Sequence, residues 1–350
     1  RTNYLYQTEE ELKEVPDYTI DESKYFQGRN CCYIFILSSD PESMVGVDPK
    51  KLKIANVAYS KKAGPEILSY RASNHGQWTI VGYPCKAWAR KVFPNDNEEI
   101  AMNKLWEAIL KTVRVTKDND PDEEWNKHNA TLQEHCKIMN KYNFKELRYK
   151  NCMGTDLRIS LPEGHIWEGG CEKTNNEKKI VFNPNMPTEE IFTTPHRNAV
   201  NGIVYATKPL IHSGSPIEDF WIKFEDGRIV DYDAKVGKEV LKNIIETDEG
   251  SHYLGEVALV PYDSPISKSG IIFYETLFDE NASCHLAIGA AYETTVKGTE
   301  GKTKEELIKM GVNDSFTHVD FMVGSKDLSI IGITKDGEEI PVFVNGNFAF

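Results

Sequence analysis

The spacing of apolar residues changes once along this chain, near residue 147, and that change restricts the possible folds more than any other feature. Before it, short β-branched and aromatic runs at 31–38 and 77–84, typical of buried strands, alternate with longer segments of helical spacing. After it, short runs of alternating polar and apolar residues dominate. We therefore predict a fold of α/β and α+β character: a βαβ-type domain with a partly parallel sheet over 1–146, and a mainly antiparallel β domain with a few helices over 147–350.

Turn and helix signals add detail to this outline. Asp-Gly pairs at 226–227 and 336–337 indicate two hairpins in the second domain. Asn95 or Asp96 is the expected N-cap of a helix in the first domain. The segments with helical spacing are 48–71, 95–115, 122–141, 237–247, 280–292 and 303–311.

Composition and charge narrow the functional classes. The chain of 350 residues carries a formal net charge of −13, which argues against a general affinity for nucleic acid or an anionic membrane. No apolar run approaches the ~20 residues of a membrane-spanning helix, and the N-terminus lacks the apolar region of a signal peptide. The seven cysteines are scattered and form no CxxC pair, a pattern typical of reduced thiols in a cytoplasmic protein.

Several acidic side chains stand in apolar surroundings and are candidates for chemistry. His318 and Asp320 are two apart in a predicted strand, so both point to one face, and an imidazole beside a carboxylate is a common ligand pair for divalent ions. Glu256 interrupts an apolar strand, and the adjacent Glu189 and Glu190 lie in an extended segment between two prolines. Each has a plain alternative: a surface ion pair, an edge residue facing water, or an exposed acidic loop.

The segment 278–292 places Glu280, His285 and Tyr292 around a run of small apolar residues. If 280–292 is helical, His285 and Tyr292 are two turns apart and share a face. The alternative is a helix that carries a satisfied histidine. Together with the acids above, the chain offers four carboxylates and two imidazoles, roughly the complement of a two-metal site, whereas a one-metal hydrolytic site needs three protein ligands. These six candidates are Glu190, Glu256, Glu280, His285, His318 and Asp320.

Several motifs, in the same order, resemble those of the thermophilic-type metalloaminopeptidases, the aminopeptidase S and aminopeptidase T group. The resemblance covers most of the chain and implies a cytoplasmic exopeptidase that uses two divalent metals and forms a homodimer. The family has a further N-terminal βα segment, which we expect this chain to lack, as it also lacks an initiator Met. The motifs are NPNMPTEEIFTTP, LGEVALVP, TLFDENASCHLAIGAAY, HVDFMVG and PVFVNGNFAF, supported by QWTIVGYPCKAWARKVFP and GTDLRISLPEGHIWEGG.

The resemblance also assigns roles. It implies that the six candidates are the metal ligands, with Glu190 rather than Glu189 as the ligand of the PTEE motif, and that Tyr292 is the active-site tyrosine. We expect Tyr292 to donate a hydrogen bond to the oxyanion and Glu189 to act as general base, with Glu280 as the alternative base if it binds no metal. His196 and Glu275 stand where we expected other polar residues.

The function expected from these assignments is the release of N-terminal amino acids from peptides by water activated at a dinuclear metal site. The mixed oxygen and nitrogen ligands suit zinc, cobalt or manganese, and the substrates would be peptides with a free N-terminus. Two other classes stay open. The chain could be a catalytically inactive or regulatory peptide-binding protein on the same scaffold, or a carboxylate-rich phosphoesterase, although no Arg or Lys lies within the motifs that carry the six candidate ligands.

Overall fold

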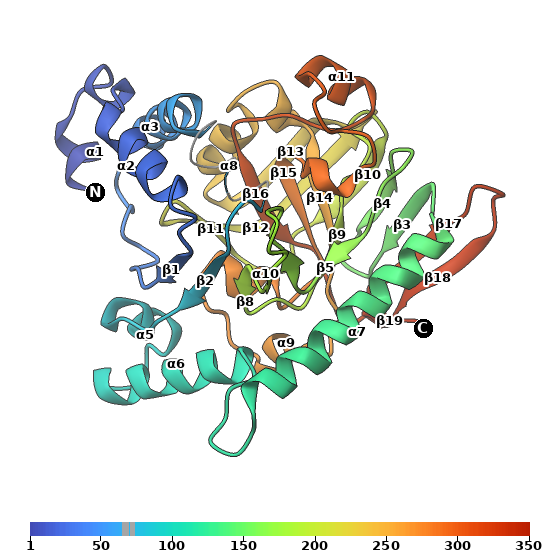
Figure 1. Ribbon diagram of the computed structural model, residues 1–350, viewed down its shortest axis with the longest axis horizontal. Coiled ribbons are helices and arrows are strands. Elements are labelled where there is room, and N and C mark those ends of the chain that lie inside the picture. Colours follow the sequence, from blue (N-terminus) through green and yellow to red (C-terminus); the bar gives the residue numbers. More distant parts are fainter. Residues whose placement is uncertain (65–69, 71–73) are drawn as a thin grey trace. The chain divides into compact units, whose positions relative to one another are not determined.

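The computed structural model (Figure 1) describes residues 1–64, 70 and 74–350. These residues form two compact units. The first unit comprises residues 1–109, 171–187 and 213–215, and the second comprises 110–170, 188–212 and 216–350. The domain boundary expected between residues 146 and 147 stays a prediction. Among the described helices, none has the length and apolar character that crossing a bilayer requires.

The first unit is built on a three-stranded parallel sheet. Strands β1 (Tyr33–Leu37) and β2 (Trp78–Gly82) pair in parallel, as the two apolar runs predict, and β8 (Asn185–Met186) adds to β2, again in parallel. Strands β6 (Glu172–Lys173) and β7 (Val181–Phe182) form a small antiparallel pair. The helices that begin in this unit are α1 (Thr2–Tyr6), η1 (Glu11–Lys13), α2 (Asp17–Gln27), α3 (Pro49–Lys62), α5 (Lys86–Val92) and α6 (Glu98–Thr112).

Helix α3 lies within the segment expected to be helical, whereas residues 65–69 and 71 of that prediction lie outside the described residues. The expected cap of α6 was wrong by one or two positions. The Ile100 amide donates to the Asn97 side chain at 3.0 Å, so Asn97 caps this helix instead of Asn95 or Asp96.

The second unit contains a nine-stranded and a five-stranded sheet, and every strand pair whose register is defined is antiparallel. Both predicted hairpins are present, between β12 and β13 and between β17 and β18. The first sheet has the order β11 (Leu210–His212), β12 (Ser215–Glu225), β10 (Val200–Tyr205), β4 (Asp156–Ser160), β3 (Glu146–Lys150), β17 (Ser329–Ile333), β18 (Glu339–Val344) and β19 (Asn347–Phe348), with β13 (Arg228–Val236) paired to β12. The second has the order β16 (His318–Met322), β15 (His285–Gly289), β14 (Leu254–Leu259), β9 (Ile191–Thr193) and β5 (Glu168–Gly169).

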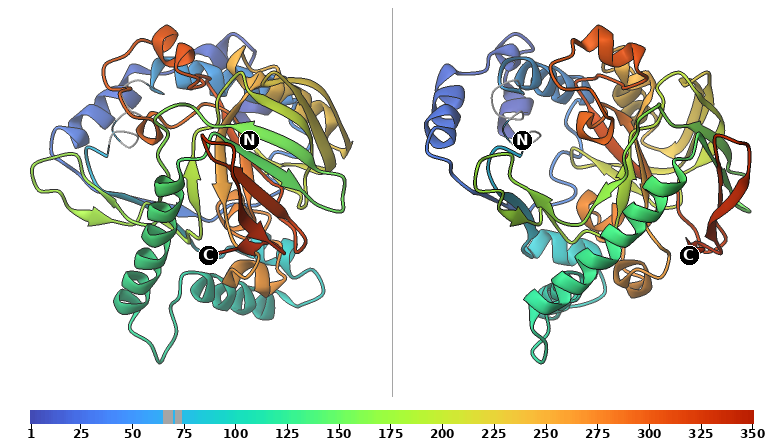
Figure 2. Two further views of the ribbon diagram at one scale, coloured as in Figure 1. Left: turned by 90° about the vertical axis from the view of Figure 1, so that its right-hand side faces the viewer. Right: turned by 45° about the vertical axis from the view of Figure 1, so that its right-hand side comes forward.

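The helices of this unit confirm three of the four predictions that fall on it. The long helix α7, green in Figure 2, begins after its cap Asp120 and contacts strands β5 and β9. Helices α8 and α11 occupy the segments expected at 237–247 and 303–311. The helices are α7 (Pro121–Tyr142), α8 (Lys238–Ile245), η3 (Gly250–His252), α9 (Pro265–Ser269), α10 (Thr276–Glu280), η4 (Glu293–Thr295) and α11 (Lys304–Lys309).

One core joins the two sheets. Alternate residues of the five-stranded sheet, such as Val257, Leu286 and Phe321, are almost completely buried and belong to the same apolar cluster as the inner face of the nine-stranded sheet. The rings of Phe321 and Phe220, one from each sheet, lie 5.8 Å apart. Because side chains alternate along a strand, the residues between these apolar ones point to the opposite face of the five-stranded sheet, away from the core.

The helix predicted over 280–292 is wrong. Helix α10 ends at Glu280, and after a short turn the chain continues as strand β15, which pairs with β14 on one side and β16 on the other. A short, fully apolar run has no periodicity that separates a central strand from a buried helix, so the pairing on both sides decides. Tyr292 therefore lies beyond the end of a strand, and not two helical turns from His285.

We expect Gly289→Ala to lower the free energy of unfolding by on the order of 3 kcal/mol. Gly289 has φ +108°, and a Cβ there would lie 2.1 Å from the backbone oxygen of Thr317, so the strand end would have to shift. Urea unfolding of the metal-free protein measures the change. Gly28→Ala is the control, because Gly28 has helical φ and its nearest Cβ contact is 3.3 Å. An equal effect of both substitutions would contradict this explanation.

Candidate metal centre

Five of the six predicted ligands lie on the face of the five-stranded sheet that is turned away from the shared apolar core. In the register, Ala287 of β15 is paired with Glu256 of β14 on one side and with Asp320 of β16 on the other, so these side chains share a face. His285 and His318 lie two positions from Ala287 and Asp320 and point the same way. Glu190 immediately precedes β9, the neighbour of β14. The alternation that buries one face of the sheet therefore brings these side chains together on the other.

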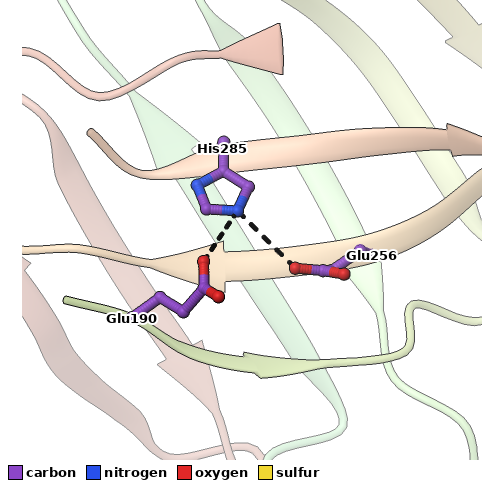
Figure 3. A group of neighbouring side chains, drawn as sticks. All are labelled: Glu190, Glu256 and His285. Atoms are coloured by element: carbon purple, nitrogen blue, oxygen red, sulfur yellow. Dashed lines mark ion pairs between the residues drawn. The ribbon is translucent and has the colours of Figure 1, made fainter. Parts of the chain in front are cut away.

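Glu256 lies between the two imidazoles. Its Oε1 is 3.6 Å from Nε2 of His285 and its Oε2 is 3.3 Å from Nε2 of His318. On the His285 side, Glu190 Oε2 approaches the same Nε2 to 3.0 Å (Figure 3). On the other side, Asp320 Oδ1 is 3.4 Å from Nε2 of His318. The result is two three-residue groups, each with its ligand atoms within 4.8 Å of one another, that share Glu256.

Both imidazoles are oriented by their second nitrogen. Nδ1 of His285 lies 3.1 Å from the backbone oxygens of Glu280 and Ser283, and Nδ1 of His318 lies 2.7 Å from the oxygen of Ala290. Since carbonyl oxygens only accept, each Nδ1 carries a proton, and Nε2 is directed at the carboxylates. This is the usual arrangement of metal-binding histidines, whose other ring nitrogen donates to a carbonyl or carboxylate.

The charges of the group suit a cation. Burial raises the pKa of Glu190, and burial together with Asp320 raises that of Glu280 well above its ordinary value. Burial acts to raise the pKa of Glu256 as well, but the two imidazoles lower it to about 2. Burial acts to lower the pKa of His285, yet the facing carboxylates raise it well above its ordinary range. In the metal-free cluster, protons thus compensate the crowding of four buried carboxylates, and divalent cations could take the place of those protons.

Glu280 is placed differently from the other candidates. It is buried at the end of α10, close enough to Asp320, His285 and Glu190 for their charges to act on it. Its carboxylate belongs to neither of the two three-residue groups found among the described residues. The structure therefore brings five of the six predicted ligands into direct proximity and leaves the sixth beside them.

Glu189 points away from this cluster. Its carboxylate forms a bidentate ion pair with Arg114, with Nη1 to Oε1 at 2.6 Å and Nη2 donating to Oε2 at 2.8 Å. His128 Nε2 lies 3.8 Å from the same carboxylate. Neighbours in an extended segment face opposite sides, so the separation of Glu189 from Glu190 follows from the sequence, but its partner Arg114, 75 positions away, does not.

Tyr292 lies at the edge of the metal centre. Beside it is Phe192, which the sequence analysis did not identify as a site residue. The Tyr292 ring is 5.1 Å from that of His318 and 5.6 Å, in a T-shaped arrangement, from that of Phe192. Phe192 shares a face with Glu190 because it lies two positions further on, a spacing that would have identified it once the strand was assigned. Although His318 acts to lower the pKa of the Tyr292 hydroxyl, partial burial and the nearby carboxylates raise it above its ordinary value, so the hydroxyl stays protonated.

A buried sheet face with this donor set is typical of metal-dependent hydrolases. Comparison with known proteins specifies the class: the model of the thermophilic metalloprotease (M29) family matches residues 1–348, and the chain belongs to this family. It is therefore a metalloprotease, a hydrolase of peptide bonds, as the motifs predicted.

Relatives of the chain agree with the family assignment. Aminopeptidase AmpS of Bacillus subtilis is 47% identical over 344 residues, which are 97% of this chain and 82% of the relative. Aminopeptidase 2 of Geobacillus stearothermophilus is 43% identical over 98% of this chain and 82% of its own. The structure of wild-type AmpT from Thermus thermophilus superposes with a TM-score of 0.89 at 37% identity, covering all of this chain and 84% of that one. The mixed α/β fold class is confirmed by this superposition.

The buried carboxyl of Glu275 should make the stability of the metal-free protein depend on pH. Burial and the neighbouring Asp279 raise the pKa of Glu275 to about 7, so the folded state holds its proton more tightly than the unfolded state does. The stability that this proton contributes is present at low pH and is lost as the pH rises from about 4.5 to 7. We expect Glu275→Gln to be more stable than the wild type at pH 8 by on the order of 1–3 kcal/mol, with no difference near pH 4.5.

Thermal unfolding between pH 4.5 and 8 with a chelator present measures this difference, and Glu163→Gln, at an exposed position, is the control. A gain in stability that does not depend on pH would contradict the assignment.

Proposed function

We propose that this chain is an aminopeptidase that removes N-terminal residues from peptides with two divalent cations bound on either side of Glu256. The observation that supports this most strongly is the direction of the two Glu256 oxygens, one toward each imidazole. The two imidazoles belong to separate three-residue groups, so one ion bound by either group would leave the other imidazole unbound. The names of the relatives, all aminopeptidases, support the substrate class.

The residues divide into two sets around the shared carboxylate. Glu190 and His285 would hold one cation, and His318 and Asp320 the other, with Glu256 common to both. Zinc, cobalt and manganese all suit such a set of oxygen and nitrogen donors. When bound, the two ions supply Lewis acidity that polarises a peptide carbonyl and lowers the pKa of water.

The remaining chemistry is assigned to Tyr292 and to one acid. Tyr292 stays protonated and is 44% exposed, so its hydroxyl is available to donate a hydrogen bond to the oxyanion that forms from the substrate carbonyl. Of the two acids considered as proton acceptor, Glu189 has both oxygens engaged by Arg114, whereas Glu280 lies within reach of the charges of the ligand side chains. We therefore favour Glu280 as the acceptor. The metal content of Glu280→Gln shows whether it also serves as the sixth ligand.

The cellular setting is part of this proposal. All seven cysteines are free, which supports a reducing compartment such as the cytoplasm. The homodimer rests on the family resemblance, and the size of the protein in solution, measured by light scattering, tests it. A catalytically inactive peptide-binding protein would not need both histidines held with Nε2 toward the carboxylates.

Removing the shared carboxylate should affect both metal positions. We expect Glu256→Gln to reduce the bound metal from about two ions per chain to less than one. Release of an amino acid from a chromogenic amide should fall by about 10³-fold or more, since metal stabilisation of the transition state is worth several kcal/mol. His318→Ala should abolish activity but retain one ion. Metal analysis after dialysis measures the content, with Glu338→Gln, at an exposed position, as the control. Full activity in Glu256→Gln would end this proposal.

Tyr292→Phe removes only the hydroxyl group and so tests its contribution to turnover. We expect kcat to fall by about 10²–10³-fold, the usual cost of losing one oxyanion donor, with little change in KM and none in metal content. Steady-state kinetics with an aminoacyl amide, together with metal analysis, provide the readout. A variant with wild-type kcat would show that the hydroxyl takes no part in the reaction.

A further inference from the structure

A buried ion pair next to the metal centre has no role in the chemistry described above. The guanidinium of Arg114 and the carboxylate of Glu189 are in bidentate contact, and their side chains are only 16% and 4% exposed. A bidentate Arg–carboxylate pair fixes orientation as well as charge, because both partners are planar. Glu189 is directly followed by Glu190, so whatever fixes the first residue limits where the second can point.

The Arg114 end of the pair is itself held in place. Arg114 follows the end of helix α6 in a left-handed conformation with φ +58°, and two backbone hydrogen bonds fix this helix end: the Arg114 amide donates to the oxygen of Lys111 at 3.1 Å and the Val115 amide donates to that of Leu110 at 2.9 Å. Its backbone oxygen accepts a hydrogen bond from Asn119 Nδ2 at 2.8 Å, and its guanidinium lies 5.8 Å from the ring of Trp125. Trp125 in turn donates from Nε1 to the oxygen of Val113 at 2.8 Å. The guanidinium is thus presented to Glu189 by a fixed loop.

The Glu189 end is also fixed through its backbone. The Glu189 amide donates to Asn281 Oδ1 at 2.7 Å, and the oxygen of Thr188 lies 2.7 Å from Nε2 of His128. Asn281 follows Glu280 directly, so its side chain connects the segment that carries Glu190 to the segment that carries Glu280. Three side chains from separate parts of the chain therefore hold residues 188–190 in one conformation.

We propose that Arg114 is a positioning residue that clamps Glu189 and thereby holds the Glu190 carboxylate against His285 for metal binding. Glu189 then serves as the anchor of this clamp and takes no part in proton transfer. The inference rests on the proposed function, in which Glu190 is a metal ligand. The buried carboxylate of Glu189 is costly to leave without a charged partner, and Arg114 is that partner. Because Glu190 is the next residue, the same ion pair also fixes the position of a metal ligand.

A double-mutant cycle tests this proposal with Zn²⁺ alone as the probe. Arg114→Gln and Glu189→Gln each leave an unpaired buried charge, and we expect each to weaken Zn²⁺ binding by about 10- to 100-fold, as loss of a group that orients a metal ligand does. The double variant has two neutral amides that can bond to each other, so we expect its Zn²⁺ affinity and turnover to return to within a few-fold of the wild type. Competition with a chromophoric chelator measures the affinity.

The competing role for Glu189 gives the opposite pattern. If Glu189 accepted the proton, Glu189→Gln and the double variant would lose turnover equally and keep wild-type Zn²⁺ affinity, which would overturn the proposal. A purely structural pair would lower the unfolding temperature of the single variants without changing the Zn²⁺ affinity of the folded protein, and this result would also overturn it. Arg114→Lys keeps the charge but not the planar fork, so we expect intermediate affinity.

Two further variants distinguish failure of the clamp from failure of the proposed function. Glu190→Gln should weaken Zn²⁺ binding directly; if it does not, the proposed function fails, whereas a loss in Glu190→Gln without a loss in Glu189→Gln defeats only the clamp. Glu134→Gln, which breaks the exposed pair with Lys137 on α7, controls for the loss of an ion pair as such and should change nothing. If the single variants do not fold, the double variant decides: native Zn²⁺ affinity together with retained turnover supports the clamp, and low affinity or lost turnover in a folded double variant contradicts it.

Discussion

The contact on which this structure depends is that of Glu256 with two imidazoles at once. A carboxylate in the middle of a central strand, 5% exposed, is costly to bury unless both of its oxygens are satisfied. Here each oxygen faces a different histidine, and each histidine faces a second carboxylate. The charges form one continuous group, so the position of every member depends on the others.

The two-sheet architecture is what makes this arrangement possible. Strands β14, β15 and β16 bury one set of side chains in the shared core, and a shift of register by one residue would exchange the apolar and the charged sets. The core therefore fixes which face carries the charges. Small residues at Ala258, Ala287 and Gly289, which alternate with the charged ones on that face, leave the space above the sheet to the longer side chains. Apolar burial on one side thus sets the geometry of a polar site on the other.

The sequence predicted the strand faces and the hairpins, because local periodicity and turn residues specify both. The two-residue spacing of His318 and Asp320 placed them on one face, and the Asp-Gly turns marked both hairpins correctly. The helix predicted around His285 was wrong, because a run of small apolar residues fits a helix and a strand equally well until the neighbouring strands are known. No local pattern marks Arg114 as the partner of Glu189. It is far from Glu189 in sequence, and only the fold brings the two side chains together.

The most direct test of the account is the position of bound metal in a crystal of the loaded protein, read from anomalous scattering at the absorption edge of zinc. We expect two peaks, one on each side of the Glu256 carboxylate, the first beside His285 and the second beside His318. A single peak, or peaks remote from Glu256, would contradict the claim that this one carboxylate is shared between two ions.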